Sequence, residues 1–169
     1  FVNSSGDTLI VEHCDISDTY GGAGDDCIAA HNAKKVVISN TSMTGNPETG
    51  KTDAIDLDGV SGGTVSGNTI FGYSDDGIDI GTSSSNMVVG ENAIQFCDMG
   101  ISVGEGSTAL VYKNQLSHSN AGIQSHTGAV VVARLNTLYG NNYGIRAFHY
   151  DGDESSGGII NVSSSIISG

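Results

Sequence analysis

Apolar and polar residues alternate with a period of two in several short stretches of the chain. Ile55-Asp56-Leu57-Asp58 and Ile78-Asp79-Ile80 are two such stretches, and glycine, asparagine and serine separate them from the next ones. This alternation is typical of a β-strand with one buried face. No stretch keeps the 3.6-residue period of an amphipathic helix. The pattern therefore predicts an all-β chain of many short strands, including strands over residues 55–58 and 78–80.

The strand pattern repeats at a nearly constant interval. An isoleucine recurs every 22 to 27 residues, as the last residue of six triplets: Asp26-Cys27-Ile28, Asp53-Ala54-Ile55, Asp76-Gly77-Ile78, Met99-Gly100-Ile101, Ala121-Gly122-Ile123 and Tyr143-Gly144-Ile145. About half a period later Val37, Val65, Val89, Val111 and Ala133 each stand three residues before an asparagine, namely Asn40, Asn68, Asn92, Asn114 and Asn136. Strands of this length cannot bury an apolar face alone, but stacked coils bury a continuous core.

The repeat predicts the fold. We expect one right-handed parallel β-helix over residues 1–169, with about seven coils of 22 to 28 residues. The six isoleucines should form one interior column, and the asparagines should form a ladder at a turn, because stacked amides bond along such a ladder. Neither end of the sequence offers an obvious capping helix, so we also expect the domain to belong to a longer chain.

Charge and composition narrow the classes of partner. Six basic residues face nineteen acidic ones, for a net charge of −13, which excludes nucleic acid as a partner in the absence of bridging cations. No apolar run reaches the roughly 18 residues that a membrane-spanning helix needs, so we expect no membrane insertion. Cys14, Cys27 and Cys97 form no CxxC pair and are interpreted as small buried residues. We expect a secreted or cell-surface protein.

Aspartates gather at equivalent positions of successive coils. Asp53 and Asp76 stand two residues before the anchor isoleucine, Asp56 and Asp79 stand one residue after it, and Asp75 precedes Asp76. Equivalent positions in neighbouring coils lie about 5 Å apart, and carboxylates so close raise one another's pKa unless a cation neutralises them. Calcium accepts six to eight oxygen ligands in flexible geometry, so the pattern predicts a Ca²⁺ site.

The stretch Ser74-Asp75-Asp76-Gly77-Ile78-Asp79, with Asp53 one coil before it, resembles the calcium site of polysaccharide lyase family 9, in the superfamily of pectate-lyase-like β-helices. The resemblance implies that Asp53, Asp75, Asp76 and Asp79 hold a calcium ion that binds the carboxylate of an acidic polysaccharide. In that family a lysine one coil later removes the C5 proton of the sugar.

The matching stretch of this chain is Gly100-Ile101-Ser102-Val103-Gly104, so Ser102 stands in the position of the catalytic lysine. A serine hydroxyl is too weak a base to take the C5 proton without a partner. Catalysis therefore stays open, and no catalytic residue is assigned. Arg146 shares the column of Asp79, and His126 lies on the same outward face. We expect Arg146, His126 and Ser102 to contact the polysaccharide.

Two alternatives remain. Gly24-Asp25-Asp26-Cys27-Ile28-Ala29 resembles the paired-aspartate motif of polygalacturonases, but the other motifs of that family do not occur in the sequence. The second alternative is a structural or adhesive β-helix segment of a surface protein, in which calcium only neutralises and stiffens the coils.

Overall fold

The chain winds through three parallel sheets, each with seven strands among the residues described. The computed structural model describes residues 2–4, 7–17, 25–48, 50–149 and 157–169. Sheet A contains β1 (Val2–Ser4), β4 (Ile28–His31), β7 (Ile55–Asp58), β10 (Asp76–Gly81), β13 (Met99–Val103), β16 (Ala121–Ser125) and β19 (Tyr143–Ala147). Sheet B contains β2 (Thr8–Glu12), β5 (Lys35–Ser39), β8 (Gly63–Ser66), β11 (Met87–Gly90), β14 (Thr108–Tyr112), β17 (Val130–Arg134) and β20 (Ile159–Ser163). Sheet C contains β3 (Asp15–Ser17), β6 (Ser42–Thr44), β9 (Thr69–Phe71), β12 (Ala93–Gln95), β15 (Gln115–Ser117), β18 (Thr137–Tyr139) and β21 (Ile166–Ser168).

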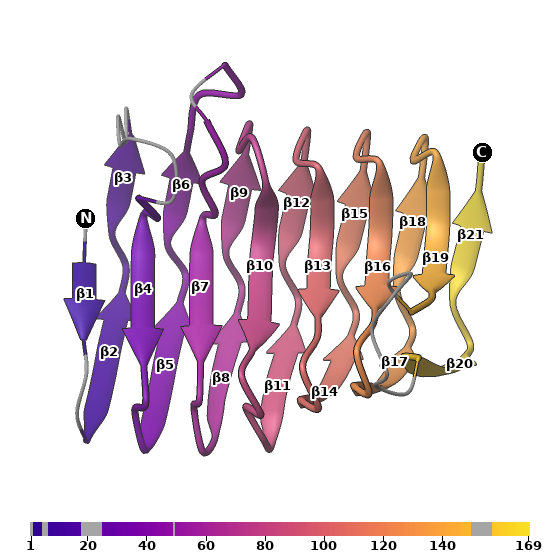
Figure 1. Cartoon of the computed structure of the whole chain (residues 1–169). Helices are drawn as coiled ribbons and strands as arrows, with labels where there is room; N and C mark the ends of the chain where they lie inside the picture. Colours follow the sequence, from indigo (N-terminus) through magenta and orange to yellow (C-terminus); the bar gives the residue numbers. More distant parts are fainter. Residues whose placement is uncertain (1, 5–6, 18–24, 49, 150–156) are drawn as a thin grey trace.

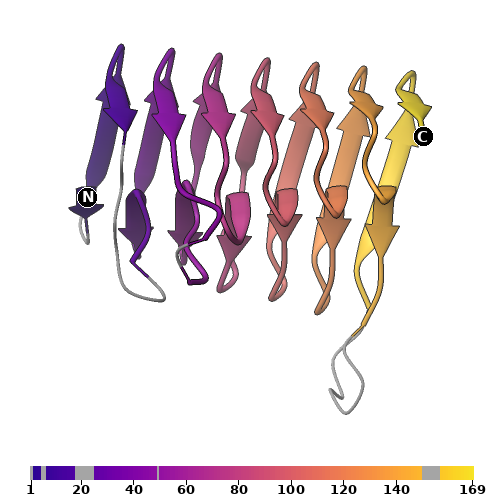
Figure 2. The ribbon, with the colours of Figure 1, turned by 90° about the horizontal axis from the view of Figure 1, so that it is seen from above.

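Each coil contributes one strand to every sheet. Neighbours within a sheet are therefore three strands apart in the chain, and all of them pair in parallel (Figure 1). Seen from above, the coils stack as similar flattened loops (Figure 2). The predicted all-β parallel β-helix is confirmed.

The interior of sheet A is the predicted isoleucine column. Strand pairing aligns Ile28, Ile55, Ile78, Ile101, Ile123 and Ile145 in that order. The first five are fully buried, and Ile145 at the end of the column is partly buried against the core. The register predicted for this sheet is therefore correct, because alternation with one apolar face leaves no other way to bury these side chains.

A column of small residues beside the isoleucines interrupts the alternation. A Cβ added to Gly77 would lie 2.5 Å from Ile94 Cγ2, and one added to Gly122 would lie 2.5 Å from Leu138 Cδ2. Gly77 and Ile78 therefore both face the core, and there is no room for a side chain at Gly77. As a result Asp76, which comes before Gly77, lies on the same outer face of sheet A as Asp79.

The asparagine ladder forms, but with four members. Each amide of Asn68, Asn92 and Asn114 bonds the amide of the next member, up to Asn136, at 3.0 Å. The predicted register was wrong for the first coil of this ladder: Val37 pairs with Thr64, and Ile38 pairs with Val65. Asn40 is therefore exposed, and Thr41 stands in the ladder position and donates its N–H to Asn68 Oδ1. Paired residues of these two coils are 27 positions apart in all three sheets, as Ile28 and Ile55 are. The predicted pairing of Val37 with Val65 assumed 28 positions.

Asn114→Ala is expected to lower the free energy of unfolding by about 3 to 5 kcal/mol. Its buried amide donates to Val89 O and accepts from both nitrogens of Asn92, and each buried partner left without a bond costs about 1–3 kcal/mol. Denaturant unfolding measures the change. The matched control is Asn40→Gly, which keeps the left-handed backbone (φ 49°) at an exposed position and should cost less than about 0.5 kcal/mol. Equal losses in both variants would contradict the ladder.

The cysteines differ in exposure. Cys27 and Cys97 are buried, as predicted, but Cys14 is exposed, so its interpretation as a buried residue was wrong. Cys14 follows β2 at a turn, where the side chain has no core to enter. Within the part of the chain that the structure describes, no helix could cross a bilayer.

Candidate functional site

The outer face of sheet A carries the predicted site residues in one register. Strand pairing aligns Asp56 with Asp79, Asp79 with Ser102, Ser102 with Gln124 and Gln124 with Arg146. These pairs are the ones that the sequence spacing predicts. The face carries aspartates on β7 and β10 and Arg146 on β19, so its acidic and basic residues are separated along the rod.

Asp26, Asp53 and Asp76 occupy equivalent positions of three successive coils and are linked by hydrogen bonds from side chain to backbone. Asp26 Oδ1 accepts the backbone N–H of Asp53 at 2.9 Å, and Asp53 Oδ1 accepts the backbone N–H of Asp76 at 2.7 Å. The last of the three, Asp76, is only 8% exposed. Its Oδ1 atom is buried and accepts no hydrogen bond from any described residue. A buried carboxylate oxygen without a donor is costly, so this atom needs a cation or a proton.

The structure brings all five predicted metal ligands together. Carboxylate oxygens of Asp53, Asp75 and Asp76 lie within 4.8 Å of one another, and so do those of Asp53, Asp56 and Asp79. Asp53 belongs to both groups and joins them. We call these five residues the aspartate cluster.

Burial and mutual repulsion make it unfavourable for the carboxylates of the aspartate cluster to be ionised together. Burial, followed by the neighbouring aspartates, raises the pKa of Asp53 to about 8. Burial and the charge of Asp56 raise the pKa of Asp79 to about 7, and burial with the charges of Asp79 and Asp53 raises the pKa of Asp76 well above its usual value. Without a counter-ion, these side chains retain protons near neutral pH. Several hard oxygens in a partly buried group are the kind of ligand set that calcium takes, and Asp76 Oδ1, which accepts no hydrogen bond from the described residues, could serve as one of those ligands.

His31 is a member of the site that sequence reasoning did not assign. Its Nε2 lies 2.8 Å from Asp56 Oδ2, and this hydrogen bond is the main reason why the pKa of His31 is raised. Oxygens of Asp56 and Asp58 and the His31 nitrogen form a third group within 4.8 Å. A protonated His31 therefore neutralises Asp56 at one edge of the aspartate cluster. The signal was available in the sequence, because His31 and Asp58 occupy the same column.

Ser102 lies directly beside the aspartate cluster. The residue is buried, and its hydroxyl acts to lower the pKa of both Asp79 and Asp76, against the larger effect of burial. Its Oγ lies 3.5 Å from Nε2 of His126 in the next coil. Ser102 thus stands between the acidic end of the face and the imidazole, a contact that the sequence columns did not predict.

Arg146 is not a part of the aspartate cluster. Its Nε donates to Gln124 Oε1 at 3.0 Å, and its Nη2 bonds the same oxygen. The guanidinium lies 4.5 Å from the centre of the Phe148 ring and 5.4 Å from that of Tyr143. Three strand spacings, about 14 Å, separate its column position from Asp79. Arg146 is thus held in place as a separate cation on the same face.

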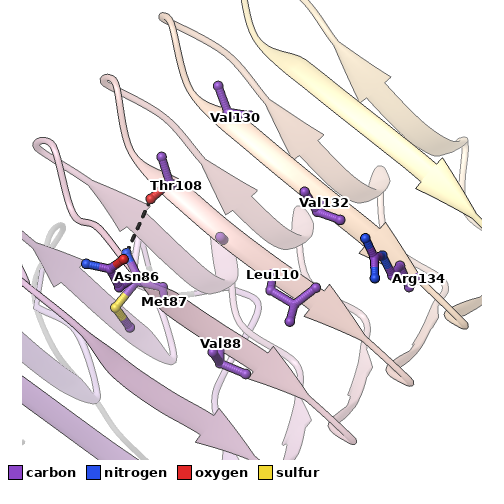
Figure 3. Close-up of a pocket in the computed structure, with 9 residues that line it drawn as sticks. Asn86, Met87, Val88, Thr108, Leu110, Val130, Val132 and Arg134 are labelled. Atoms are coloured by element: carbon purple, nitrogen blue, oxygen red, sulfur yellow. Dashed lines mark hydrogen bonds between the residues drawn. The ribbon is translucent and has the colours of Figure 1, made fainter.

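A shallow groove lies on the outer face of sheet B (Figure 3). Val88, Leu110 and Val132 follow one another across its floor, and Thr108 accepts the N–H of Asn86 at 3.3 Å at one side. Arg134 is its one charged lining residue. The lining of this groove contains no carboxylate, histidine or cysteine, so it offers no titratable cluster comparable with the face of sheet A.

Comparison with known proteins agrees with the architecture. Neither a curated protein nor a solved structure matches the chain. A family model described as right handed beta helix region matches residues 1–166. The match covers nearly the whole chain and agrees with three stacked parallel sheets. The chain therefore belongs to the family of right-handed β-helix proteins.

Proposed function

We propose that this β-helix binds acidic polysaccharide outside the cell through a calcium ion held by the aspartate cluster. The observation that carries the proposal is the buried Oδ1 of Asp76, which accepts no hydrogen bond from the described residues, in a side chain grouped with the carboxylates of Asp53 and Asp75. Asp53, Asp75, Asp76 and Asp79 would ligate the ion, with Asp56 shared between the ion and His31. Bound calcium would leave part of its coordination shell for a sugar carboxylate, because it takes six to eight oxygens.

The rest of the face supports a polyanion as the partner. Arg146 is a fixed cation about three strand spacings from Asp79 along the rod, and Tyr143 and Phe148 flank it. A polymer lying along the rod would reach calcium with one carboxylate and Arg146 with another. Ser102 and His126 lie between these two points and would contact the sugar between them.

A second candidate function has its own support. The carboxylates of Asp26 and Asp53 accept backbone N–H groups of the next coil, so these residues help to join the coils. In this alternative calcium neutralises and stiffens a structural or adhesive segment, as in a surface protein, and the face of sheet A binds no sugar. In that case the aspartate motif would resemble that of polysaccharide lyases because of common descent, without a shared function.

Titration calorimetry with oligogalacturonate separates the two candidates. Binding should require calcium, and Arg146→Gln should weaken the affinity for the oligosaccharide about tenfold while it leaves the heat of calcium binding unchanged, because Arg146 lies outside the aspartate cluster. Asp15→Asn, on the exposed edge of β3, is the control for loss of one charge. Calcium binding without any sugar binding would favour the structural role.

A further inference from the structure

We propose that a second surface of the rod, a row of four aromatic rings at the carboxyl ends of the sheet C strands, binds an uncharged polysaccharide chain. The rings belong to Phe71, Phe96, His118 and Tyr139, which come from four successive coils. We call these four residues the aromatic row. The row contains no member of the aspartate cluster, so this site is separate from the calcium-dependent binding proposed above.

The rings follow one another along the rod, as the strands of sheet C do (Figure 1). The ring centres of Phe71 and Phe96 are 5.2 Å apart, those of Phe96 and His118 are 4.9 Å apart, and those of His118 and Tyr139 are 5.6 Å apart. All four residues are exposed, Phe71 and Phe96 at 46% each. The row is therefore a continuous apolar ridge that crosses three strand spacings, about 14 Å.

Two of the rings stand where neighbouring coils have glycine. Gly72 and Gly140 follow the last residues of β9 and β18, with φ angles of 76° and 63°. Phe96 and His118 occupy the same position after β12 and β15, with φ 57° in both. A left-handed backbone is sterically unfavourable for a residue with a large side chain. The chain thus accepts strain at two positions that complete the row, and strain of this kind is concentrated at functional sites.

A buried hydroxyl on the same face lacks a partner. Ser117, the last residue of β15, pairs in register with Gln95 and Tyr139 on the outer face of sheet C, because Leu116 beside it faces the core. Ser117 is 1% exposed, and its Oγ forms no hydrogen bond with any described residue. A buried hydroxyl without a partner is costly. A sugar hydroxyl would supply the missing bond once a neighbouring side chain turns aside to admit it.

The charge of this face decides which class of partner fits. No residue of the described strands β6, β9, β12, β15, β18 and β21 is charged, in a chain with nineteen acidic and six basic residues. Single-stranded nucleic acid also stacks on rows of aromatic rings, but a net charge of −13 repels its phosphates. A second copy of the chain carries the same net charge and is repelled as well. An uncharged polysaccharide meets no such repulsion.

The side chains of the face suit a neutral sugar chain. The face of an aromatic ring is apolar and negative, so it packs against the C–H groups of a sugar ring. Phe71 and Tyr139, at the two ends of the row, have one ring neighbour each within it, so a face of each is left for a sugar. Gln95, Gln115 and Thr69 present amides and a hydroxyl beside the row, where they are exposed or half-buried. A polymer lying along the rod would pack on the rings and hydrogen-bond these groups.

The test is titration calorimetry with cellohexaose and with xylohexaose, two uncharged oligosaccharides, in the presence of chelator. At least one of them should bind without calcium. The double variant Phe96→Gly and His118→Gly removes two rings and has the residue that neighbouring coils have at this position, so its melting temperature should stay close to that of the intact chain. Its affinity should fall about tenfold, because two ring contacts are lost. Ser117→Ala should weaken binding about threefold without lowering the melting temperature.

Leu135→Gly is the matched control. Leu135 is also exposed, apolar and left-handed (φ 57°), but it follows β17 in the turn between sheets B and C. This variant should bind as the intact chain does. Cellohexaose or xylohexaose binding should also persist in Asp76→Asn, and calcium-dependent oligogalacturonate binding should persist in the double variant, so the aromatic row and the aspartate cluster are tested separately.

Three results would overturn the proposal. The first is failure of both uncharged oligosaccharides to bind the intact chain. The second is an affinity that is unchanged in the double variant or in Ser117→Ala. The third comes from sedimentation: an intact chain that is a dimer, with a double variant that is a monomer, would identify a second copy as the occupant of the row. None of these results would affect the proposed calcium-dependent function.

Discussion

Calcium at a hundred times its dissociation constant is expected to raise the melting temperature of the protein by about 5 to 10 °C at neutral pH. An ion that binds the native state alone at that concentration adds about 2.7 kcal/mol to the free energy of unfolding. For a domain of this size, 1 kcal/mol corresponds to roughly 2–4 °C. The physical source of the effect is the aspartate cluster, whose buried carboxylates gain a counter-charge and whose Asp76 Oδ1 gains a partner.

Asp76→Asn and Asp79→Asn test this expectation with side chains of the same shape. Each variant should lose most of the calcium-induced increase in melting temperature, and the double variant should lose all of it. Both variants should melt no lower than the intact chain in chelator, because burial and the neighbouring charges raise the pKa of both carboxyl groups, and an uncharged amide avoids the cost of ionising them. Asp15→Asn, on the exposed edge of β3, should keep the full response. A calcium response that survives in the double variant would place the ion elsewhere.

The fold was predictable because its signal lies in the order of residues along the chain. Ile55 and Leu57 alternate with Asp56 and Asp58, and only one face of such a strand can enter a core. Repetition of that strand then fixes which side chains are neighbours, because coils stack one strand spacing apart. The pairing of Asp56 with Asp79 in the structure follows from this rule.

Contacts between side chains of different columns were harder to predict from the sequence. The contact of Ser102 with His126 joins neighbouring coils at positions two residues apart in register, and it depends on the space above Gly104. The pair of His31 and Asp56 is a diagonal contact of the same kind. A list of columns predicts which backbones are neighbours, but it does not predict which way a long side chain turns. The misplaced Asn40 has a different cause. Val36, Val37 and Ile38 are all apolar, so the alternation did not decide which of them faces the core, and the match of Asn40 with Asn68 favoured an offset that was one residue too long.

In calcium-free buffer, the stability of the protein is expected to fall as pH rises from about 4 to 8. Asp53, with a pKa raised to about 8, and Asp79, with a pKa raised to about 7, hold protons in the native state that the unfolded chain releases near pH 4. Each proton retained in this way makes the free energy of unfolding fall by about 1.4 kcal/mol per pH unit between the unfolded and the folded pKa. The direction is opposite to that of carboxylates in ordinary ion pairs, whose folded pKa is depressed.

Urea unfolding at a series of pH values, with chelator and with calcium, measures this slope. Asp53→Asn should flatten it in chelator, because an amide neither binds nor releases the proton that Asp53 retains, whereas Asp15→Asn should not change it. Calcium should reduce the slope or reverse it, because the ion displaces protons from its ligands and therefore binds more tightly as pH rises. Stability in chelator that increases steadily from pH 4 to 8 would mean that the aspartate cluster is ionised at little cost in the native protein, and the electrostatic reason for a bound cation would be lost.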